Sequence, residues 1–153
     1  MAEVNELLHS YKKIGIDTAI FIYHFESNQK YFPITRMILK LLDSGSISAV
    51  TSEITIMEIL VRPLQFEKFD VADEYETLLD NFPNLEIKAI DRKVSRRAAE
   101  IRAKYDLKPA DAIQVSTALV NGANAFISND LSFKKVDELD ILLLEELIHG
   151  LEQ

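Results

Sequence analysis

The sequence of 153 residues contains no cysteine, and it has only four glycines and four prolines. The lack of cysteine excludes disulfides, thiolate metal ligands and cysteine nucleophiles. Long apolar runs are also missing, because the longest, residues 19–23, is far shorter than the roughly 18 residues of a membrane-spanning helix. The first residues show no charged segment followed by an apolar stretch, so no secretory signal is visible. These absences predict a cytoplasmic protein that does not use a membrane as partner.

Basic side chains are outnumbered, since 17 Lys and Arg against 25 Asp and Glu give a net charge of −8. This balance argues against a general nucleic-acid coat and against binding to an anionic membrane surface. The glycine motifs GxGxxG and GxxxxGK[ST] are absent, as is the GxSxG turn of a nucleophilic serine. The three histidines lie far apart without metal-ligand spacing. We therefore expect neither a glycine cradle for nucleotide phosphates nor a histidine-based metal site.

What the sequence does contain is an alternation of short apolar runs and longer amphipathic segments. The apolar runs predict five strands, at residues 14–18, 47–50, 85–90, 125–127 and 141–144. Apolar residues at helical spacing predict helices at residues 32–42, 66–82 and 91–105, and from Pro109 to about residue 121. A further helix should follow residue 52 and end or kink at Pro63, and the first dozen residues could form an extra helix. The pattern predicts a single α/β domain over residues 1–153.

Four carboxylates fall where this layout would bring chemistry together. Asp17 ends the first predicted strand, Glu58 lies on the helix after the second, Asp111 opens a helix, and Asp130 follows the fourth strand. Taken singly, each has an ordinary explanation as a helix cap, an Asx turn, a first-turn charge or a solvated side chain. In an open parallel sheet, however, ligands bind at the carboxyl ends of the strands. Oxygen ligands without His or Cys suit Mg²⁺ or Mn²⁺, which predicts phosphoryl transfer or phosphodiester hydrolysis.

The order and spacing of these segments resemble the PIN domain family. The resemblance rests on IGIDT at residues 14–18, a helical Glu about forty residues later, DAIQVSTAL at residues 111–119 and SND at residues 128–130. More narrowly, the length and layout resemble the VapC-type ribonuclease toxins of prokaryotic toxin–antitoxin pairs, over about residues 14–144. The resemblance implies a three-layer α/β/α sandwich around a mostly parallel sheet of about five strands. It also implies metal-dependent endonucleolytic cleavage of RNA.

The same resemblance implies roles for particular residues. The family's acidic cluster, which would be both catalytic and metal-binding, matches Asp17, Glu58, Asp111 and Asp130, and auxiliary positions near the metal match Ser128 and, more weakly, Thr18. The cluster would hold one or two Mg²⁺ or Mn²⁺ ions that activate a water for in-line attack on a phosphodiester. Asp17 and Asp130 are the expected direct ligands, with Glu58 and Asp111 as ligands or as partners of metal-bound water. Many relatives have a further Asp where this chain has Ser132, which bears on a second metal site.

Positive charge is concentrated in one stretch. Residues 88–108 hold eight basic and three acidic side chains, a net charge of +5, so the other 132 residues carry −13. One interpretation is a solvated helix face whose long side chains cover apolar surface. The other is a patch that guides an RNA backbone toward Asp111, with the candidate RNA-binding residues Arg92, Arg96, Arg97 and Lys108.

Apolar side chains around Phe66 and Phe69, beside Pro63, leave three interpretations open. The family resemblance implies a homodimer and a cognate antitoxin, so these side chains could serve dimerisation or antitoxin docking, whereas core packing is the ordinary alternative. Two alternatives to a toxin also stay open: a PIN-type nuclease of RNA maturation or decay, and a catalytically weak PIN fold that binds RNA or protein. Ser132 favours the weak form, and the four retained carboxylates speak against it.

Overall fold

A parallel sheet of five strands forms the centre of the protein. The computed structural model describes residues 2–152, with side chains up to residue 150. The strand order is β3-β2-β1-β4-β5, where the strands are β1 (Ile14–Ile16), β2 (Ala49–Ser52), β3 (Leu85–Lys88), β4 (Ala125–Ser128) and β5 (Asp140–Leu143). Every neighbouring pair runs parallel, and Ile16 lies opposite Ile127 in the central pair. The predicted α/β class and its five strands are confirmed.

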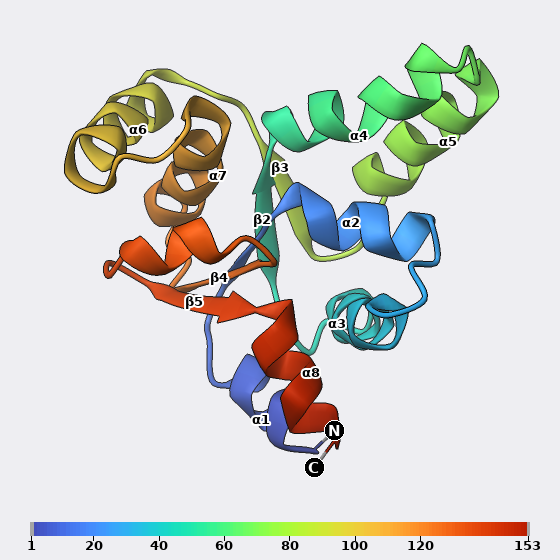
Figure 1. Cartoon of the computed structure of the whole chain (residues 1–153), viewed down its shortest axis with the longest axis horizontal. Helices are drawn as coiled ribbons and strands as arrows, with labels where there is room; N and C mark the ends of the chain where they lie inside the picture. Colours follow the sequence, from blue (N-terminus) through green and yellow to red (C-terminus); the bar gives the residue numbers. More distant parts are fainter. Residues whose placement is uncertain (1, 153) are drawn as a thin grey trace.

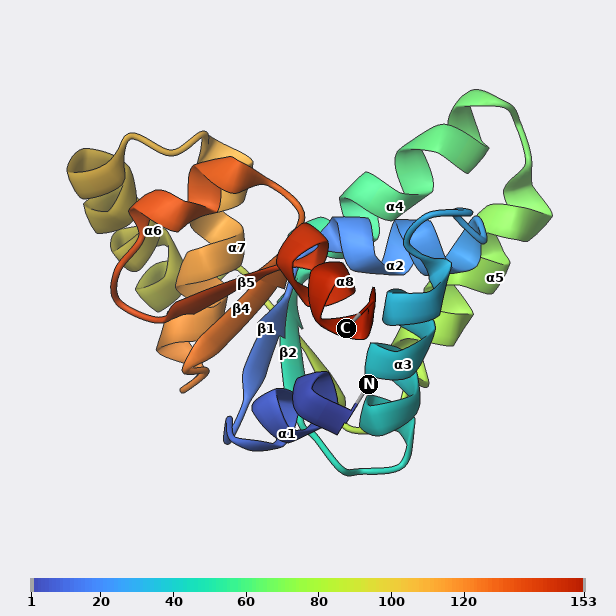
Figure 2. The same cartoon turned by 60° about the horizontal axis from the view of Figure 1, so that its bottom comes forward.

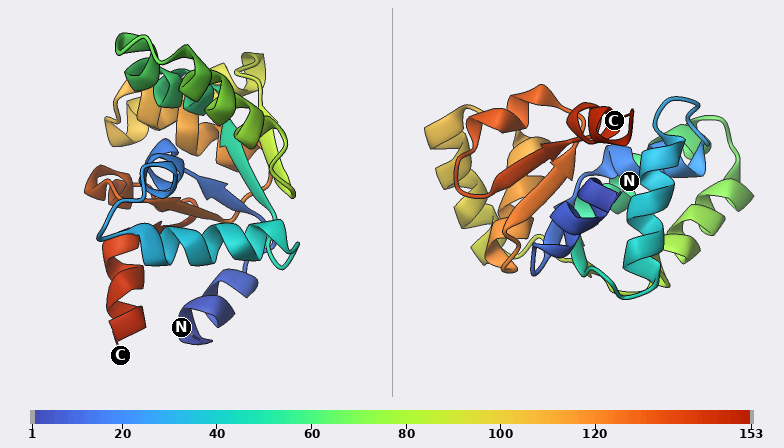
Figure 3. Two further views of the ribbon diagram at one scale, coloured as in Figure 1. Left: turned by 90° about the vertical axis from the view of Figure 1, so that its right-hand side faces the viewer. Right: turned by 90° about the horizontal axis from the view of Figure 1, so that it is seen from below.

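Helices cover both faces of this sheet and give the predicted three layers (Figures 1 and 2). They are α1 (Ala2–His9), α2 (Thr18–Phe25), α3 (Phe32–Asp43), α4 (Glu53–Gln65), α5 (Phe69–Asp80), α6 (Arg92–Tyr105), α7 (Pro109–Val120) and α8 (Leu144–Glu152), with the short 3₁₀ helix η1 (Leu131–Lys135). In Figure 2, α6 and α7 lie on one side of the sheet, whereas α2 and α3 lie on the other. Figure 3 shows α1 and α8 next to each other beyond the sheet, consistent with their direct contacts.

Two apolar cores fill the space between these layers. The larger core joins the sheet to α1, α2, α3, α4, α5 and α8, and the smaller core joins it to α6, α7 and η1. Gly15 allows α7 to approach β1 closely, because a Cβ atom at this position would lie 2.6 Å from the Ala118 Cβ and 2.8 Å from the Phe126 Cδ1. This close approach matters for the site, because Asp111 and Gln114 lie on the same helix.

Several predicted boundaries and elements differ from the structure. The first strand ends at Ile16 rather than at residue 18, because Asp17 caps α2 and Thr18 already belongs to that helix. Pro63 does not end α4, which continues to Gln65 before the chain turns. The predicted helix over residues 66–82 is shorter, beginning at Phe69 and ending at Asp80. Helix α2, helix α8 and η1 were not predicted as elements.

None of the helices within residues 2–152 combines the length and apolar character that crossing a membrane requires.

Candidate functional site

The four predicted carboxylates line one pocket at the carboxyl ends of the central strands. This pocket, with a volume of about 570 Å³, is lined by Asp17, Thr18, Glu58, Asp111 and Asp130, together with apolar and amide side chains from α2 and the segment after β4. Asp17 follows β1, Asp130 follows β4, Glu58 lies on α4 and Asp111 lies in the first turn of α7. Parallel pairing brings these ends to the same edge. The topology thus assembles side chains that are up to 113 residues apart in the sequence.

Hydrogen bonds hold Asp17 at the junction of β1 and α2. Its Oδ1 accepts a hydrogen bond from the Thr18 amide at 2.9 Å, which caps the helix, and its Oδ2 accepts from the Ser128 hydroxyl at 2.7 Å. The Ser128 oxygen in turn accepts from the Asp130 amide at 3.1 Å. Ser128 is fully buried, so its hydroxyl fixes the two strand-end aspartates relative to each other. Asp17 therefore combines the capping role that its sequence position allowed with a place in the pocket.

Glu58 is held from the opposite side of the pocket. Its Oε1 accepts a hydrogen bond of 2.7 Å from the hydroxyl of Thr18, a buried residue at the start of α2. The Thr18 oxygen also lies 3.0 Å from the Thr55 hydroxyl and accepts from the Gln114 side-chain amide at 2.9 Å. The carboxylate is thus tied to a buried polar cluster drawn from α2, α4 and α7.

Repulsion and burial act together on these carboxylates. The pKa of Asp17 rises from its usual value of 3.8 to about 6. Burial is the main cause and the charges of Glu58 and Asp111 add to it, while the hydrogen bonds from Ser128 and Thr18 oppose it. The pKa of Asp111 is raised as well, first by burial and then by the charges of Asp130 and Glu58, whereas Lys108 lowers it. Negative charge is therefore concentrated in the pocket beyond what the protein itself neutralises.

This donor set suits a hard divalent cation. Within residues 2–152, no Lys or Arg side chain forms an ion pair with any of the four carboxylates. The same residues contain no group of three or more His, Cys, Asp or Glu side chains already arranged around a metal position. Mg²⁺ keeps several of its waters and is usually bound through only one or two carboxylates, so it does not need such a closed cage. A cation in the pocket would favour the ionised forms of Asp17 and Asp111, which burial and, after it, the charges of neighbouring carboxylates disfavour.

The segment after β4 is where the chain departs from the resembled pattern. Asp130 is exposed, and its Oδ1 accepts a 2.9 Å hydrogen bond from the Ser132 amide, which caps η1. The Ser132 hydroxyl is buried and has no hydrogen-bond partner among the described residues. Ser132 therefore supplies a buried hydroxyl, and no charge, beside Asp130.

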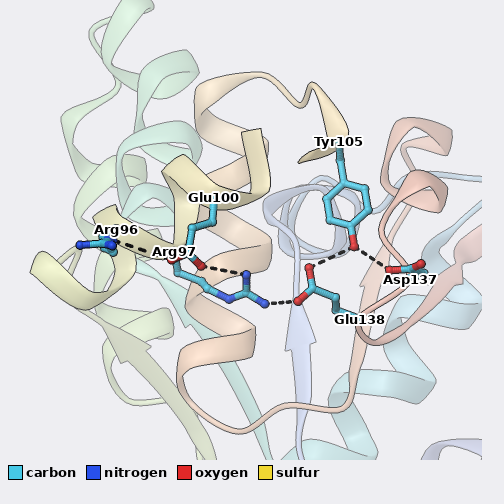
Figure 4. A network of polar contacts seen from close by, with 6 residues as sticks. All are labelled: Arg96, Arg97, Glu100, Tyr105, Asp137 and Glu138. Carbon is cyan, nitrogen blue, oxygen red and sulfur yellow. Dashed lines mark hydrogen bonds and ion pairs between the residues drawn. The ribbon is translucent and has the colours of Figure 1, made fainter. Parts of the chain in front are cut away.

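The predicted basic residues differ in what they contact. Figure 4 shows Arg97 on α6 paired with Glu138 and, at 3.2 Å, with Glu100. Tyr105 contacts the same region through hydrogen bonds to Asp137 at 2.6 Å and Glu138 at 3.0 Å, so this network ties α6 to the segment before β5. Arg96 is more loosely paired, with Glu100 at 3.8 Å. Arg92 and Lys108 are exposed and form no ion pair with the residues that the structure describes.

The apolar residues after α4 lie on the surface. Phe66 is 64% exposed and Phe69 is 60% exposed, so core packing is not their role, although Pro63 is buried. Beside them lies a second pocket of about 540 Å³ between α2, α4 and α5, which shares Ile22 and Glu58 with the carboxylate pocket. Dimerisation and antitoxin docking are therefore the two remaining interpretations of this surface.

Comparisons with known proteins identify the family. The family model described as the PIN domain matches residues 14–139, which include all four carboxylates. The chain belongs to the PIN domain family. The family resemblance inferred from the sequence is thereby confirmed. Among curated proteins, no sequence matches this PIN domain chain.

Solved structures share the PIN fold of this chain. A toxin–antitoxin complex from Klebsiella pneumoniae aligns with a TM-score of 0.65 at 21% identity, covering 86% of this chain and 97% of that one. DNA-bound VapBC from Salmonella typhimurium gives 0.62 at 21% identity, covering 87% and 98%. FitAB bound to an IR36 DNA fragment gives 0.68 at 19% identity, covering 86% and 94%. At these identities the likeness establishes a common fold over almost the whole of each neighbour.

Sequence reasoning missed the buried side chains behind the pocket. Thr51, Thr55 and Gln114 were not assigned to the site, yet they form the polar cluster that contacts Thr18. A signal did exist, because Gln114 interrupts an otherwise apolar or small-residue face of α7. Its meaning depends on what α7 packs against, which only the assembled fold provides.

Proposed function

We propose that this PIN domain protein is a metal-dependent endoribonuclease and acts as the toxin of a toxin–antitoxin pair. The observation that carries the proposal is the convergence of Asp17, Glu58, Asp111 and Asp130 on one pocket, with mutual repulsion among them. Such a set of oxygen donors, at an open edge accessible to a polymer, suits phosphodiester hydrolysis. The PIN family match and the structural neighbour described as a toxin–antitoxin complex support the same function.

The four carboxylates are the residues that would hold Mg²⁺ or Mn²⁺, with Asp17 and Asp130 as direct ligands. When bound, such a cation supplies a Lewis acid for the phosphodiester and lowers the pKa of a bound water. Ser128 orients Asp17 through its 2.7 Å hydrogen bond, and Thr18 orients Glu58 through a bond of the same length. With Ser132 in place of a further acidic residue, the chain offers fewer charged ligands for a second cation.

The RNA backbone would approach along the basic stretch that leads into α7. Lys108 immediately precedes α7, and its charge opposes the rise in the pKa of Asp111 that burial and the neighbouring carboxylates cause. Of the four candidate residues, Arg92, Arg96 and Lys108 are exposed, whereas Arg97 is partly buried and engaged with Glu100 and Glu138. We assign RNA binding mainly to Arg92 and Lys108, with Arg96 contributing and Arg97 fixing α6 in place.

Two protein partners complete the proposal: a second copy of the chain and a cognate antitoxin. Met57, Val61 and Leu64 lie on one face of α4 and are 58%, 46% and 45% exposed, which supplies an apolar surface for a homodimer. The exposed Phe66 and the adjoining pocket between α2, α4 and α5 supply a second apolar surface for the antitoxin. The neighbours described as VapBC and FitAB complexes support an antitoxin partner.

The direct test offers the purified, metal-free protein a single-stranded RNA and a DNA of the same sequence. We expect cleavage of the RNA, and not the DNA, when Mn²⁺ or Mg²⁺ is added, and loss of cleavage when EDTA is present in excess. Metal-independent cleavage, or equal cleavage of the DNA, would contradict the proposed function. Stoichiometric binding of the RNA without cleavage would favour the alternative of a binding module.

A further inference from the structure

We propose that Gln114 is a positioning residue that sets the direction of the hydrogen bonds ending on Glu58. Gln114 lies on α7 and is only 2% exposed to solvent. Its side chain does not line the carboxylate pocket. The inference rests on the proposed function, because it assigns Gln114 a purpose in presenting Glu58 to a divalent cation.

The hydrogen bonds form a connected, buried cluster. The Gln114 Nε2 lies 2.9 Å from the Thr18 hydroxyl oxygen and 2.8 Å from the Thr55 hydroxyl oxygen. The Thr18 hydroxyl lies 2.7 Å from the Glu58 Oε1. On the other branch, the Thr55 and Thr51 hydroxyl oxygens lie 2.8 Å apart, and Thr51 lies 2.8 Å from the Ile16 carbonyl oxygen. All three threonines are buried.

The directions of these bonds follow from counting hydrogens. A carbonyl oxygen only accepts, so Thr51 must use its single hydrogen toward Ile16, and Thr55 must then donate to Thr51. An ionised carboxylate also only accepts, so Thr18 must donate to Glu58. Thr18 and Thr55 have no hydrogen left for each other and need a donor from elsewhere. The two hydrogens of the Gln114 amide meet both needs.

Rotating the Gln114 amide to the opposite orientation breaks the cluster. The oxygen would then face two hydroxyls, each of which would have to donate to it, and Thr18 would lose its hydrogen bond to Glu58. The two amide hydrogens would point to where Oε1 now lies, a buried position without a partner among the described residues. A buried polar group left without its hydrogen bond is destabilising, so the orientation with Nε2 toward the threonines is strongly preferred.

The consequence for the site is a fixed Glu58. Because Gln114 only donates to the Thr18 oxygen, the Thr18 hydrogen is always directed at Glu58 Oε1, which leaves Oε2 as the oxygen available for the pocket. An apolar side chain at residue 114 would free the Thr18 hydroxyl to rotate toward Thr55, which lies 3.0 Å away. Residues that orient a metal ligand in this way typically change metal affinity by about 10- to 100-fold when they are replaced.

The test measures Mn²⁺ affinity by calorimetry on the metal-free protein, without RNA. We expect Gln114→Met to weaken Mn²⁺ binding by about 10-fold, the lower end of the effect of outer-shell residues. Ser116→Ala is the matched control, because Ser116 is also fully buried on α7 and its hydroxyl has no partner among the described residues. It should leave the affinity unchanged. If Gln114→Met does not fold, Gln114→Leu replaces it, with circular dichroism in EDTA as the check.

A double-mutant cycle separates positioning from a general structural effect. Because Gln114 acts on Glu58 only through Thr18, Gln114→Met should have no further effect on Mn²⁺ affinity in a Thr18→Val background. An equal loss in both backgrounds, or unchanged affinity in Gln114→Met alone, overturns the inference while Mn²⁺ binding by the wild type keeps the proposed function. No Mn²⁺ binding by the wild type overturns both.

Discussion

Three effects act on the Asp17 side chain: helix capping, burial and repulsion by neighbouring carboxylates. It caps α2, accepts a hydrogen bond from Ser128, and lies near two other carboxylates. Its pKa of about 6 means that the folded protein holds a proton there more tightly than the unfolded chain, in which the usual value near 3.8 applies. At neutral pH the ionised Asp17 therefore lowers the stability of the metal-free folded protein. This loss of stability accompanies a carboxylate that is positioned to bind a cation.

The first prediction concerns the metal-free stability of Asp17→Asn. Between pH 4 and 6 the unfolded chain loses the Asp17 proton before the folded protein does, so wild-type stability in EDTA should fall as pH rises through this window. The asparagine variant lacks this titration. It should be more stable than the wild type at pH 7, by at most roughly 2–3 kcal/mol for a shift of this size, and the difference should vanish below pH 4.

Urea unfolding in EDTA across this pH range measures the difference. Asp73→Asn, at an exposed position on α5, is the control and should match the wild type at each pH. The contradicting result is that Asp17→Asn, compared with the wild type, is less stable at pH 7 than at pH 4. That result would show that the fold stabilises the ionised form of Asp17 instead of disfavouring it.

At this scale the sequence predicted the carboxylates and two of the residues that support them, Ser128 and Thr18, but not Thr55 and Gln114. Asp17 and Asp130 could be found because they directly follow apolar runs that read as strands, and strand ends in a parallel sheet meet at one edge. Gln114 and Thr55 could not, because each is an ordinary helical residue until α7 packs against β1 and α4. Thr18 was assigned a weaker place near the metal, and the structure gives it a contact with Glu58.

At the scale of elements, the connection between α6 and α7 links the basic stretch to the pocket. Arg97, Glu138 and Tyr105 fix α6 against the segment before β5, and Lys108 directly precedes α7, next to Asp111. A cation that close to the carboxylates would meet a phosphate of any RNA bound in the pocket.

The second prediction is that Lys108→Gln reduces the salt dependence of RNA binding. Removing one phosphate contact should lower the slope of log affinity against log salt concentration by about 0.7 for a single strand. Lys12→Gln is the control, because Lys12 is exposed and precedes β1, at the opposite end of the strands. Fluorescence anisotropy with labelled RNA, in Ca²⁺ or EDTA to prevent cleavage, gives both slopes. Equal slopes for Lys108→Gln and the wild type would remove Lys108 from the RNA-binding surface.

Helices whose apolar residues recur at regular helical spacing were predicted from the sequence. Helices without such spacing were not. Helices α3, α6 and α7 lie within two residues of their predicted bounds, because each combines apolar spacing with clear end signals. Helix α2 has the sequence TAIFIYHF, in which apolar residues lie on all sides, so no amphipathic period marks it. Of the two expected effects of Pro63 on α4, ending the helix is wrong, because the helix extends two residues beyond it. Tertiary packing decides these cases.

At the scale of the whole molecule, charge and apolar surface are unevenly distributed. A protein with a net charge of −8 concentrates carboxylates in one pocket, and half of the Lys and Arg side chains that form no ion pair among the described residues lie on α6 or directly before α7. Exposed apolar side chains gather on α4 and at its end instead of being scattered evenly. Surfaces of this kind mark protein contacts, and the α4 face is the one assigned here to a second copy of the chain.

The third prediction is that Val61→Glu dissociates the homodimer. A carboxylate at the centre of the α4 face would be buried without a partner on association, which a dimer interface does not tolerate. Light scattering should give the mass of a dimer for the wild type and of a monomer, 17.4 kDa, for the variant. Val120→Glu, at a 37% exposed valine on α7, should remain dimeric. A wild type that is monomeric at all concentrations would contradict the assignment of this face.

The central claim is that the four carboxylates form one metal-dependent centre for RNA cleavage. The measurement that tests it most directly is the RNA cleavage rate of wild type, Asp17→Asn and Asp73→Asn during a Mn²⁺ titration. We predict that Asp17→Asn loses more than about 100-fold in rate, beyond the range of residues that only support a ligand. Asp73→Asn should cleave as the wild type does. Wild-type rates in Asp17→Asn at any Mn²⁺ concentration would contradict the account.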